Sequence, residues 1–538
     1  MKERIFSEWH VVAIPLAIYA IHASFFREWI VDDAGISFAY ARNLAEGYGL
    51  VSQPGSTPIE GFSNFLWTMI LVPFFALGVF HPVAVPKILG LLFVGASYAT
   101  LNKGLRTLTD TDTTSILIVL TLISANTAFV VWTTSGLENS VTVFLLSMLV
   151  LLTLKSCRGA RRRFLLASAM GALATGLTLT RPDGIIFFLV FPISLVLIRV
   201  FAGQSITRSH WGAIGIYSAV FAATLGAFLV FRVSYFGDIF PNTYYAKDGP
   251  NLEKVLSVLT LEPWVTARLI ELMGSVAGRW GTYVLLGLIV LSALGFQTRS
   301  LGNGHVILLL FLLASVASYL LLPPDWMKEY RFATGFIVLF YSYSVLVVGQ
   351  TLMRNPQRTK LRHASVAVLV CMLLGLCALD SVQRSATFLQ EPVVDFRWVA
   401  ERYGKKLNNF ADALDLKDGS ALLADIGGAL YCSRIRIHDL AGLCDKTIAR
   451  TLRRSNGAFR DYVFHELRPT FIHTHGYWKL AARFFNDGRF SRDYVPIDEN
   501  VDEWIMQKTG QQLRSGTYVR REVVERDPGA LARLKAIR

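Results

Sequence analysis

The sequence predicts a multi-pass α-helical membrane protein that ends in an extramembrane α/β domain. Hydrophobic residues make up 53% of the 538 residues, and the mean hydropathy is +0.43. Charged residues make up only 17%, whereas soluble globular proteins contain about 25%. Water is therefore not the main solvent of this chain, and its long apolar segments between short polar loops are typical of membrane insertion.

Eleven apolar segments approach the length of about 20 residues that a membrane span needs. They cover residues 11–26, 83–101, 113–132, 141–154, 164–180, 185–201, 212–231, 280–296, 306–322, 332–352 and 365–379. A twelfth segment, 62–80, carries Ser63, Asn64 and Pro73 and follows a loop rich in glycine and proline. We expect this twelfth segment to lie along the outer membrane surface rather than to cross the membrane.

Basic residues predict the orientation. The formal net charge of +14 could indicate nucleic-acid binding, but most basic residues lie in short loops between apolar segments. With eleven spans and a cytoplasmic N-terminus, the loops that contain Lys103, Arg158, Arg199 and Arg358 all face the cytoplasm. We therefore expect no nucleic-acid partner. The first span has no small-residue cleavage site, so it is expected to be retained.

This orientation places the polar C-terminal region outside the cytoplasm. We expect a transmembrane module at 1–380, with a first extracytoplasmic loop at 32–82, and an extracytoplasmic domain at 381–538. Short apolar runs at 421–426 and 470–473, combined with a helical segment at 395–414, predict a small α/β fold. Cys432 and Cys444 lie in this domain and are candidates for a disulfide, whereas Cys371 and Cys377 lie in an apolar run as small hydrophobic residues.

The most specific motif begins where the first span ends. It reads DDAGISFAYARNLAEGYGL from Asp32, and EGFSNFLW follows from Glu60. An acidic pair just outside a first span, followed by a long loop and an interfacial helix, resembles the C-type (GT-C) glycosyltransferases. Within that superfamily, the two motifs resemble the mycobacterial terminal β-arabinofuranosyltransferase and its bacterial relatives.

Further segments extend this resemblance over most of the chain. They read WTTSGLE at 132–138, RPDG at 181–184, YFGDIFPNT at 235–243, DWM at 325–327, YRF at 330–332 and, weakly, DLAGL at 439–443. The resemblance implies transfer of a sugar, arabinofuranosyl or another pentose, from a polyprenyl-phosphate donor. The implied acceptor is a cell-envelope glycan or glycolipid on the outer face of a bacterial inner membrane.

Transfer of this kind gives chemical roles to the acidic pair and to nearby cations. A carboxylate can take the proton of the acceptor hydroxyl, and Asp33 is slightly favoured over Asp32 for this role. The same pair are the candidate ligands for a divalent cation such as Mg or Mn. The leaving phosphate gains negative charge, which Arg181, Lys247 or Arg331 could stabilise.

The other candidate substrate-binding residues also lie in the predicted outer loops. They are Arg42, Glu60, Asn64, Glu138, Asp183, Tyr235, Asn242, Asp325 and Trp326. Each also has a structural interpretation: carboxylates at span ends avoid the bilayer, and aromatic residues there form an interfacial belt. His473 and His475 have no third ligand at metal-binding spacing, so we expect them to be exposed polar residues.

Two other functions compete with glycosyl transfer. A transporter for a polyprenyl-linked substrate would keep charged residues near the middle of the bilayer, whereas these spans are nearly free of charge and the polar motifs gather on one side. A non-catalytic glycan-binding or assembly protein stays open, because the C-terminal domain could bind a glycan. Such a binder would keep its function after loss of the Asp32–Asp33 pair.

Overall fold

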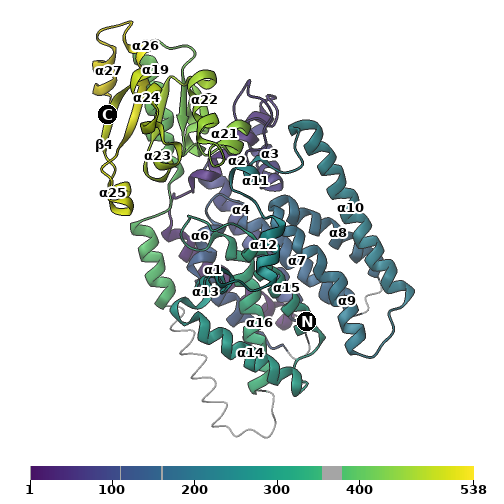
Figure 1. Cartoon of the computed structure of the whole chain (residues 1–538). Helices are drawn as coiled ribbons and strands as arrows, with labels where there is room; N and C mark the ends of the chain where they lie inside the picture. Colours follow the sequence, from purple (N-terminus) through teal and green to yellow (C-terminus); the bar gives the residue numbers. More distant parts are fainter. Residues whose placement is uncertain (1, 109–110, 159–161, 354–378, 538) are drawn as a thin grey trace. The chain divides into compact units, whose positions relative to one another are not determined.

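The computed structural model describes residues 2–108, 111–158, 162–353 and 379–537, and for residues 2–8 it describes the backbone alone. It consists mostly of helices, with one five-stranded sheet in the C-terminal region (Figure 1). The chain forms two compact units. We call residues 1–29, 83–230 and 250–393 the helical unit, and residues 30–82, 231–249 and 394–538 the sheet unit. This division differs from the predicted one, because the loop after the first span packs with the C-terminal domain.

The membrane-type helices confirm the predicted fold class. Eight helices among the described residues are long and apolar enough to cross a membrane, and a ninth span results if one bent pair counts as one. The eight cover Ala84–Leu105, Asn139–Cys157, Arg163–Thr180, Pro182–Phe201, Arg208–Phe236, Pro263–Gln297, Asn303–Leu321 and Arg331–Thr351. This protein is therefore a multi-pass membrane protein.

The three remaining predicted spans have different outcomes. Residues 113–132 form the bent pair α5 (Thr113–Ala125) and α6 (Thr127–Thr133). The first span is α1 (Lys2–Phe25), whose apolar part, Trp9–Phe25, is shorter than a typical span. The last predicted span, 365–379, lies almost entirely outside the described residues, as do Cys371 and Cys377.

The segment predicted to lie along the membrane surface forms the short helix α3. It covers Phe65–Ala76, and its 12 residues are too few to cross a bilayer. A helix is therefore present within the predicted segment 62–80 but is shorter than that segment, and its position along the membrane surface stays a prediction.

A single asparagine accounts for the bend between α5 and α6, which is 67°. Asn126 ends α5 and caps α6, because its side-chain oxygen accepts a hydrogen bond of 3.0 Å from the backbone N–H of Phe129. Its side-chain nitrogen donates to the carbonyl of Ser275 at 2.8 Å and to the hydroxyl of Tyr341 at 3.2 Å. The break is thus fixed by contacts to two other helices of the helical unit.

The sheet unit is built on five strands in the order β2-β1-β3-β5-β4. The strands are β1 (Ser420–Leu423), β2 (Arg436–Asp439), β3 (Phe471–Thr474), β4 (Tyr494–Val501) and β5 (Arg514–Arg520). β1 pairs in parallel with β2 and β3, whereas β5 is antiparallel to β3 and β4. The predicted apolar runs thus form β1 and β3. The predicted helical segment forms α18 (Phe396–Val399), the π-helix η4 (Ala400–Lys405) and α19 (Lys406–Ala413).

The core of the sheet unit includes residues from the loop after the first span. Ile36 and Tyr40 of α2 (Asp32–Ala45) are buried in the same hydrophobic cluster as Leu423 of β1 and Phe471 of β3. Phe236, from the second inserted segment, belongs to this cluster as well. Burial of these apolar side chains holds three distant parts of the chain together as one unit.

Candidate functional site

Asp32 is an anchoring residue at the start of α2 in the sheet unit. Its side chain is buried, with 5% exposure, and its two carboxyl oxygens accept hydrogen bonds from the backbone N–H groups of Gly427 and Gly428, at 3.0 and 2.7 Å. Its own N–H donates to the carbonyl of Val394 at 3.0 Å. Asp32 therefore ties the first turn of α20 (Gly427–Cys432) and the start of the C-terminal region to α2.

Two glycines make this close approach possible. A Cβ atom on Gly35 would lie 2.4 Å from the carbonyl carbon of Gly427, and one on Gly427 would lie 1.7 Å from the carbonyl oxygen of Asp32. α2 and α20 therefore pack backbone against backbone, and only glycine fits at either position. The glycines of the DDAG and IGGA segments thus set the place of Asp32.

Other acidic groups surround Asp32. Burial raises the pKa of its carboxyl, and the negative charge of Asp425 raises it further. Asp425 follows β1, and its Oδ2 lies 3.3 Å from Nε2 of His475, which follows β3. Sequence reasoning did not select Asp425. The position of Asp425 directly after a predicted strand could have identified it, because ligands of α/β sheets often bind at the carboxyl ends of parallel strands.

Asp33, the predicted base, is the next residue in the first turn of α2 and is half-buried. The carboxylate of its neighbour Asp32 accepts the hydrogen bonds from Gly427 and Gly428 that fix this turn. The two residues of the pair thus differ in their surroundings. Asp32 is buried and holds α2 to α20, whereas Asp33 is the more accessible carboxylate.

One of the two histidines differs from the prediction of exposed polar residues. His473 is buried in β3, with Nε2 3.1 Å from the hydroxyl of Tyr403 and Nδ1 3.1 Å from the hydroxyl of Thr517. Burial lowers its pKa to about 3, so it is neutral at physiological pH. The prediction was wrong for His473 because residues on a central strand face a core that the sequence does not reveal. His475 is 39% exposed.

Metal-ligating side chains are not clustered within the described part of the chain. No group of three or more His, Cys, Asp or Glu side chains gathers there closely enough to hold a metal ion. Both oxygens of Asp32 already accept backbone hydrogen bonds. Asp32 and Asp33 stay the candidate ligands for the predicted divalent cation, and no reaction step below uses one.

Glu60 and Asn64, from the second motif, are also buried in the sheet unit. Glu60 forms an ion pair with Arg232, with Oε2 2.7 Å from Nε and Oε1 3.1 Å from Nη2. Asn64 Oδ1 accepts hydrogen bonds from the hydroxyls of Ser37, at 3.0 Å, and Thr68, at 3.3 Å. Arg232 was not predicted, because it lies 172 residues from Glu60 and no local pattern links them.

Tyr235 and Asn242 join three of the motifs. The hydroxyl of Tyr235 accepts a hydrogen bond of 2.9 Å from the N–H of Leu50. Asn242 donates from its side chain to the carbonyls of Gly442 and Leu443, at 2.7 and 2.8 Å, and its N–H donates to the carbonyl of Glu60 at 3.0 Å. The segment at 235–243 therefore meets the end of the first motif at Leu50, the second motif at Glu60 and the segment at 439–443 in the sheet unit.

Arg42 and Lys247, the other predicted residues of the sheet unit, differ in their surroundings. Arg42 donates to the carbonyls of Tyr431 and Leu430, at 2.7 and 3.3 Å, and so binds the last turn of α20. Lys247 follows α11 (Asn242–Ala246) and is exposed. Arg42 thus has a structural role in addition to any contact with substrate.

The disulfide predicted between Cys432 and Cys444 is not formed, since both residues are free thiols. Cys444 faces α2, where its Sγ lies 3.7 Å from the hydroxyl of Tyr40. Cys432 is the last residue of α20 and lies beside Gly404 of η4. The prediction was wrong because the two cysteines pack against different elements.

In the helical unit, four predicted residues form one buried ion-pair network. Glu138 Oε1 lies 3.3 Å from Nη1 of Arg181 and 3.9 Å from Nη2 of Arg331. Arg181 Nη2 lies 3.1 Å from Oδ1 of Asp183, whose Oδ2 accepts a 2.6 Å hydrogen bond from the hydroxyl of Ser318. Residues from three separate motifs, WTTSGLE, RPDG and YRF, therefore meet at one group of helix ends.

A cavity of about 260 Å³ adjoins this network in the helical unit. Asp325, Trp326 and Arg331 line it, together with Arg268, Glu271 and Tyr319. Trp326 is 62% exposed, whereas Asp325 is half-buried and accepts a 3.2 Å hydrogen bond from the N–H of Met327. The cavity thus combines arginine and carboxylate side chains with an exposed indole ring.

Together, the spans and the C-terminal α/β domain define a multi-pass membrane protein of the GT-C fold. Three solved structures of the oligosaccharyltransferase AglB from the archaeon Archaeoglobus fulgidus are similar to it. The form tethered to an acceptor peptide matches at 10% identity with a TM-score of 0.60, covering 91% of this chain and 72% of that one. The complex with zinc and sulfate matches at 12% identity, a TM-score of 0.56 and coverages of 86% and 67%.

The third structure contains an inhibitory peptide and a dolichol-phosphate. It matches at 12% identity, a TM-score of 0.53 and coverages of 87% and 69%. No family model and no curated protein matches the sequence. At these identities the likeness concerns the fold.

Proposed function

We propose that this protein is a glycosyltransferase that moves a sugar from a polyprenyl-phosphate donor to a cell-envelope glycan or glycolipid. The observation that carries the proposal is the accessible Asp33 carboxylate beside the anchored Asp32, at the start of α2 in a GT-C fold. A carboxylate fixed in this way can accept a proton without reorganising the backbone around it.

The ion-pair network of the helical unit supports a phosphate-bearing donor. Arg331 lines the 260 Å³ cavity, and Arg181 lies in the same network through Glu138. Guanidinium groups bind phosphate oxygens through paired hydrogen bonds, and their positive charge stabilises the charge that a leaving phosphate gains. The dolichol-phosphate in one AglB structure is a lipid phosphate of this kind.

The proposed reaction exchanges one C–O bond for another. The bond between the anomeric carbon and the donor phosphate breaks, and its electron pair stays on the phosphate oxygen. The acceptor hydroxyl oxygen forms the new bond to the anomeric carbon and gives its proton to Asp33. The products are a glycosylated acceptor and a polyprenyl phosphate, for which Arg331 and Arg181 are the candidate binding residues.

The motifs favour a pentose, arabinofuranosyl or a related sugar, as the transferred group. This assignment rests on the resemblance of the segments that start at Asp32 and Glu60 to arabinofuranosyl transferases. The basic loops favour an outer active face in a bacterial inner membrane.

Single substitutions at the acidic pair test the proposal. Asp33→Asn keeps the size of the side chain and removes the base, so we expect turnover by the full-length protein to fall about 10²- to 10⁴-fold without a loss of thermal stability. Asp32→Asn keeps only one acceptor oxygen for two amides, so it should lower thermal stability together with turnover.

Asp412→Asn is the matched control. Asp412 belongs to an exposed ion pair with Arg434, so its substitution should leave both quantities unchanged. Near wild-type transfer by the Asp33 variant would contradict the assignment of Asp33 as the base, and absence of transfer by the wild-type protein would favour a glycan-binding or assembly protein.

A further inference from the structure

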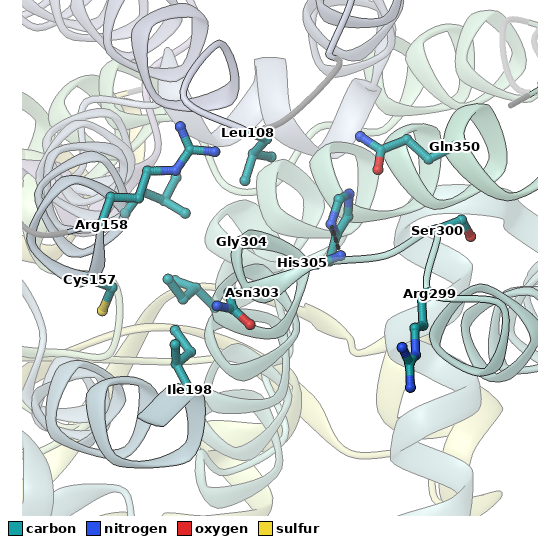
Figure 2. Close-up of a pocket in the computed structure, with 13 residues that line it drawn as sticks. Leu108, Cys157, Arg158, Ile198, Arg299, Ser300, Asn303, Gly304, His305 and Gln350 are labelled. Carbon is teal, nitrogen blue, oxygen red and sulfur yellow. Dashed lines mark hydrogen bonds between the residues drawn. The ribbon is translucent and has the colours of Figure 1, made fainter. Parts of the chain in front are cut away.

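The helical unit contains a second, larger cavity of about 380 Å³. Its polar lining includes Arg158, Arg299, Asn303 and Gln350, and Figure 2 shows the two arginines on opposite sides of Asn303 and His305. Leu108, Leu154 and Ile198 supply an apolar wall. The cavity therefore combines cationic, hydrogen-bonding and hydrocarbon surfaces.

This cavity lies at the opposite helix ends from the Glu138 network. α7 (Asn139–Cys157) starts directly after Glu138 and ends beside the cavity, so its 19 residues separate the two places by roughly 28 Å. α16 (Thr334–Met353) likewise begins after Arg331 and reaches the cavity at Gln350. The cavity is thus distinct from the candidate donor site, and it lies at the end predicted to face the cytoplasm.

The two arginines of the cavity have no counter-ion among the residues that the structure describes. Neither Arg158 nor Arg299 forms an ion pair there, and no aspartate or glutamate lines the cavity. In the same unit, by contrast, Arg181 and Arg331 share Glu138. Both arginines are exposed side chains that line one cavity, so an anion bound in it would be attracted by both charges.

We propose that this cavity binds a phosphate group, carried either by an anionic membrane lipid or by a soluble molecule. Arginine is suited to phosphate because its planar group donates paired hydrogen bonds. The amides of Asn303 and Gln350 can donate further hydrogen bonds, and the apolar wall can contact the chains of a lipid. Basic pockets between membrane helices bind anionic headgroups by this combination.

The test compares two lipids and one free anion on the full-length protein in neutral detergent. The probes are phosphatidylglycerol, phosphatidylcholine with the same acyl chains, and inorganic phosphate, with binding read by native mass spectrometry and thermal unfolding. Wild-type protein should bind phosphatidylglycerol at least tenfold more tightly than phosphatidylcholine. Stabilisation by inorganic phosphate alone would identify a soluble phosphate as the source of the ligand.

The double variant Arg158→Gln and Arg299→Gln should lose at least tenfold in affinity for the anionic probe. The matched control is Lys103→Gln with Arg208→Gln, which removes two exposed charges from loops also predicted to face the cytoplasm, outside the cavity lining. Equal losses in the two double variants, or wild-type binding by the cavity variant, would overturn the proposal.

A readout on wild-type protein covers the case in which the cavity variant fails to fold. Cys157 is a free thiol in the cavity lining, so an occupant should slow its alkylation as measured by peptide mass spectrometry. Phosphatidylglycerol or inorganic phosphate should slow this reaction at least threefold, and phosphatidylcholine should not. The same rate with all three probes would overturn the proposal.

Discussion

Two buried carboxylates of the sheet unit, Asp32 and Asp439, are held by backbone amides, whereas Glu138 and Asp183 of the helical unit are held by an arginine. Asp32 and Asp439 each accept hydrogen bonds from two backbone N–H groups, and burial raises the pKa of both. Glu138 and Asp183 instead contact Arg181. An amide-held carboxylate fixes the backbone around it, whereas an arginine-held carboxylate orients a cation. This difference is why we assign proton transfer to Asp33 in the sheet unit and phosphate binding to the helical unit.

The largest effect that follows from this comparison is expected at Glu138. In Glu138→Gln the buried guanidinium groups of Arg181 and Arg331 lose their shared counter-ion, so the free energy of unfolding should fall by about 3 kcal/mol. Thermal unfolding of the full-length protein in detergent measures it. Glu391→Gln is the control, because Glu391 pairs with Lys328 at an exposed position and should cause no measurable change. Equal stability of the two variants would contradict the buried network.

A smaller, pH-dependent effect is expected at Asp439. Burial raises its pKa to about 7 in the folded protein, above its ordinary value of about 3.8, so folding favours the protonated form. The resulting stabilisation is complete below about pH 4 and is lost as the pH rises through 7. Asp439→Asn cannot ionise, so its stability relative to wild type should improve by about 2–3 kcal/mol between pH 5 and pH 8.

The control for this prediction is the comparison of two curves, the free energy of unfolding of wild type and of Asp439→Asn as a function of pH. Asp32 and Glu60 also have raised pKa values, and they are present in both proteins, so their contribution cancels in the difference. Parallel curves for wild type and Asp439→Asn from pH 5 to pH 8 would show that Asp439 does not titrate in this range. The pKa of the amide-held Asp439 carboxyl would then not differ from that of an exposed carboxyl.

The sequence was sufficient to predict the fold class, because apolar runs of span length and alternating short strands are local signals. The pairing of distant residues was not predictable. Arg232 meets Glu60 and Asn242 meets Gly442 only after three separate segments share one hydrophobic core. The same reason explains why His473 is buried and why Cys444 faces Tyr40 rather than Cys432.

Within the candidate site, the sequence predicted which residues belong to it but not the structural role of each one. The Asp32–Asp33 pair was recognised, yet the division into an anchor and an accessible carboxylate depends on Gly427 and Gly428, almost 400 residues away. Glu138, Arg181 and Arg331 were each selected from separate motifs. These residues meet in one ion-pair network only because of how the helices pack, and helix packing cannot be predicted from a single sequence.

The most direct test of the central claim follows both products of the proposed reaction. Purified full-length protein in lipid nanodiscs would receive a polyprenyl-phosphate pentose with isotope-labelled sugar and a cell-envelope glycan acceptor. We predict that label enters the glycan, and that an equal amount of polyprenyl phosphate appears by mass spectrometry. Binding of the glycan and the donor without release of polyprenyl phosphate would contradict the account and identify a non-catalytic protein.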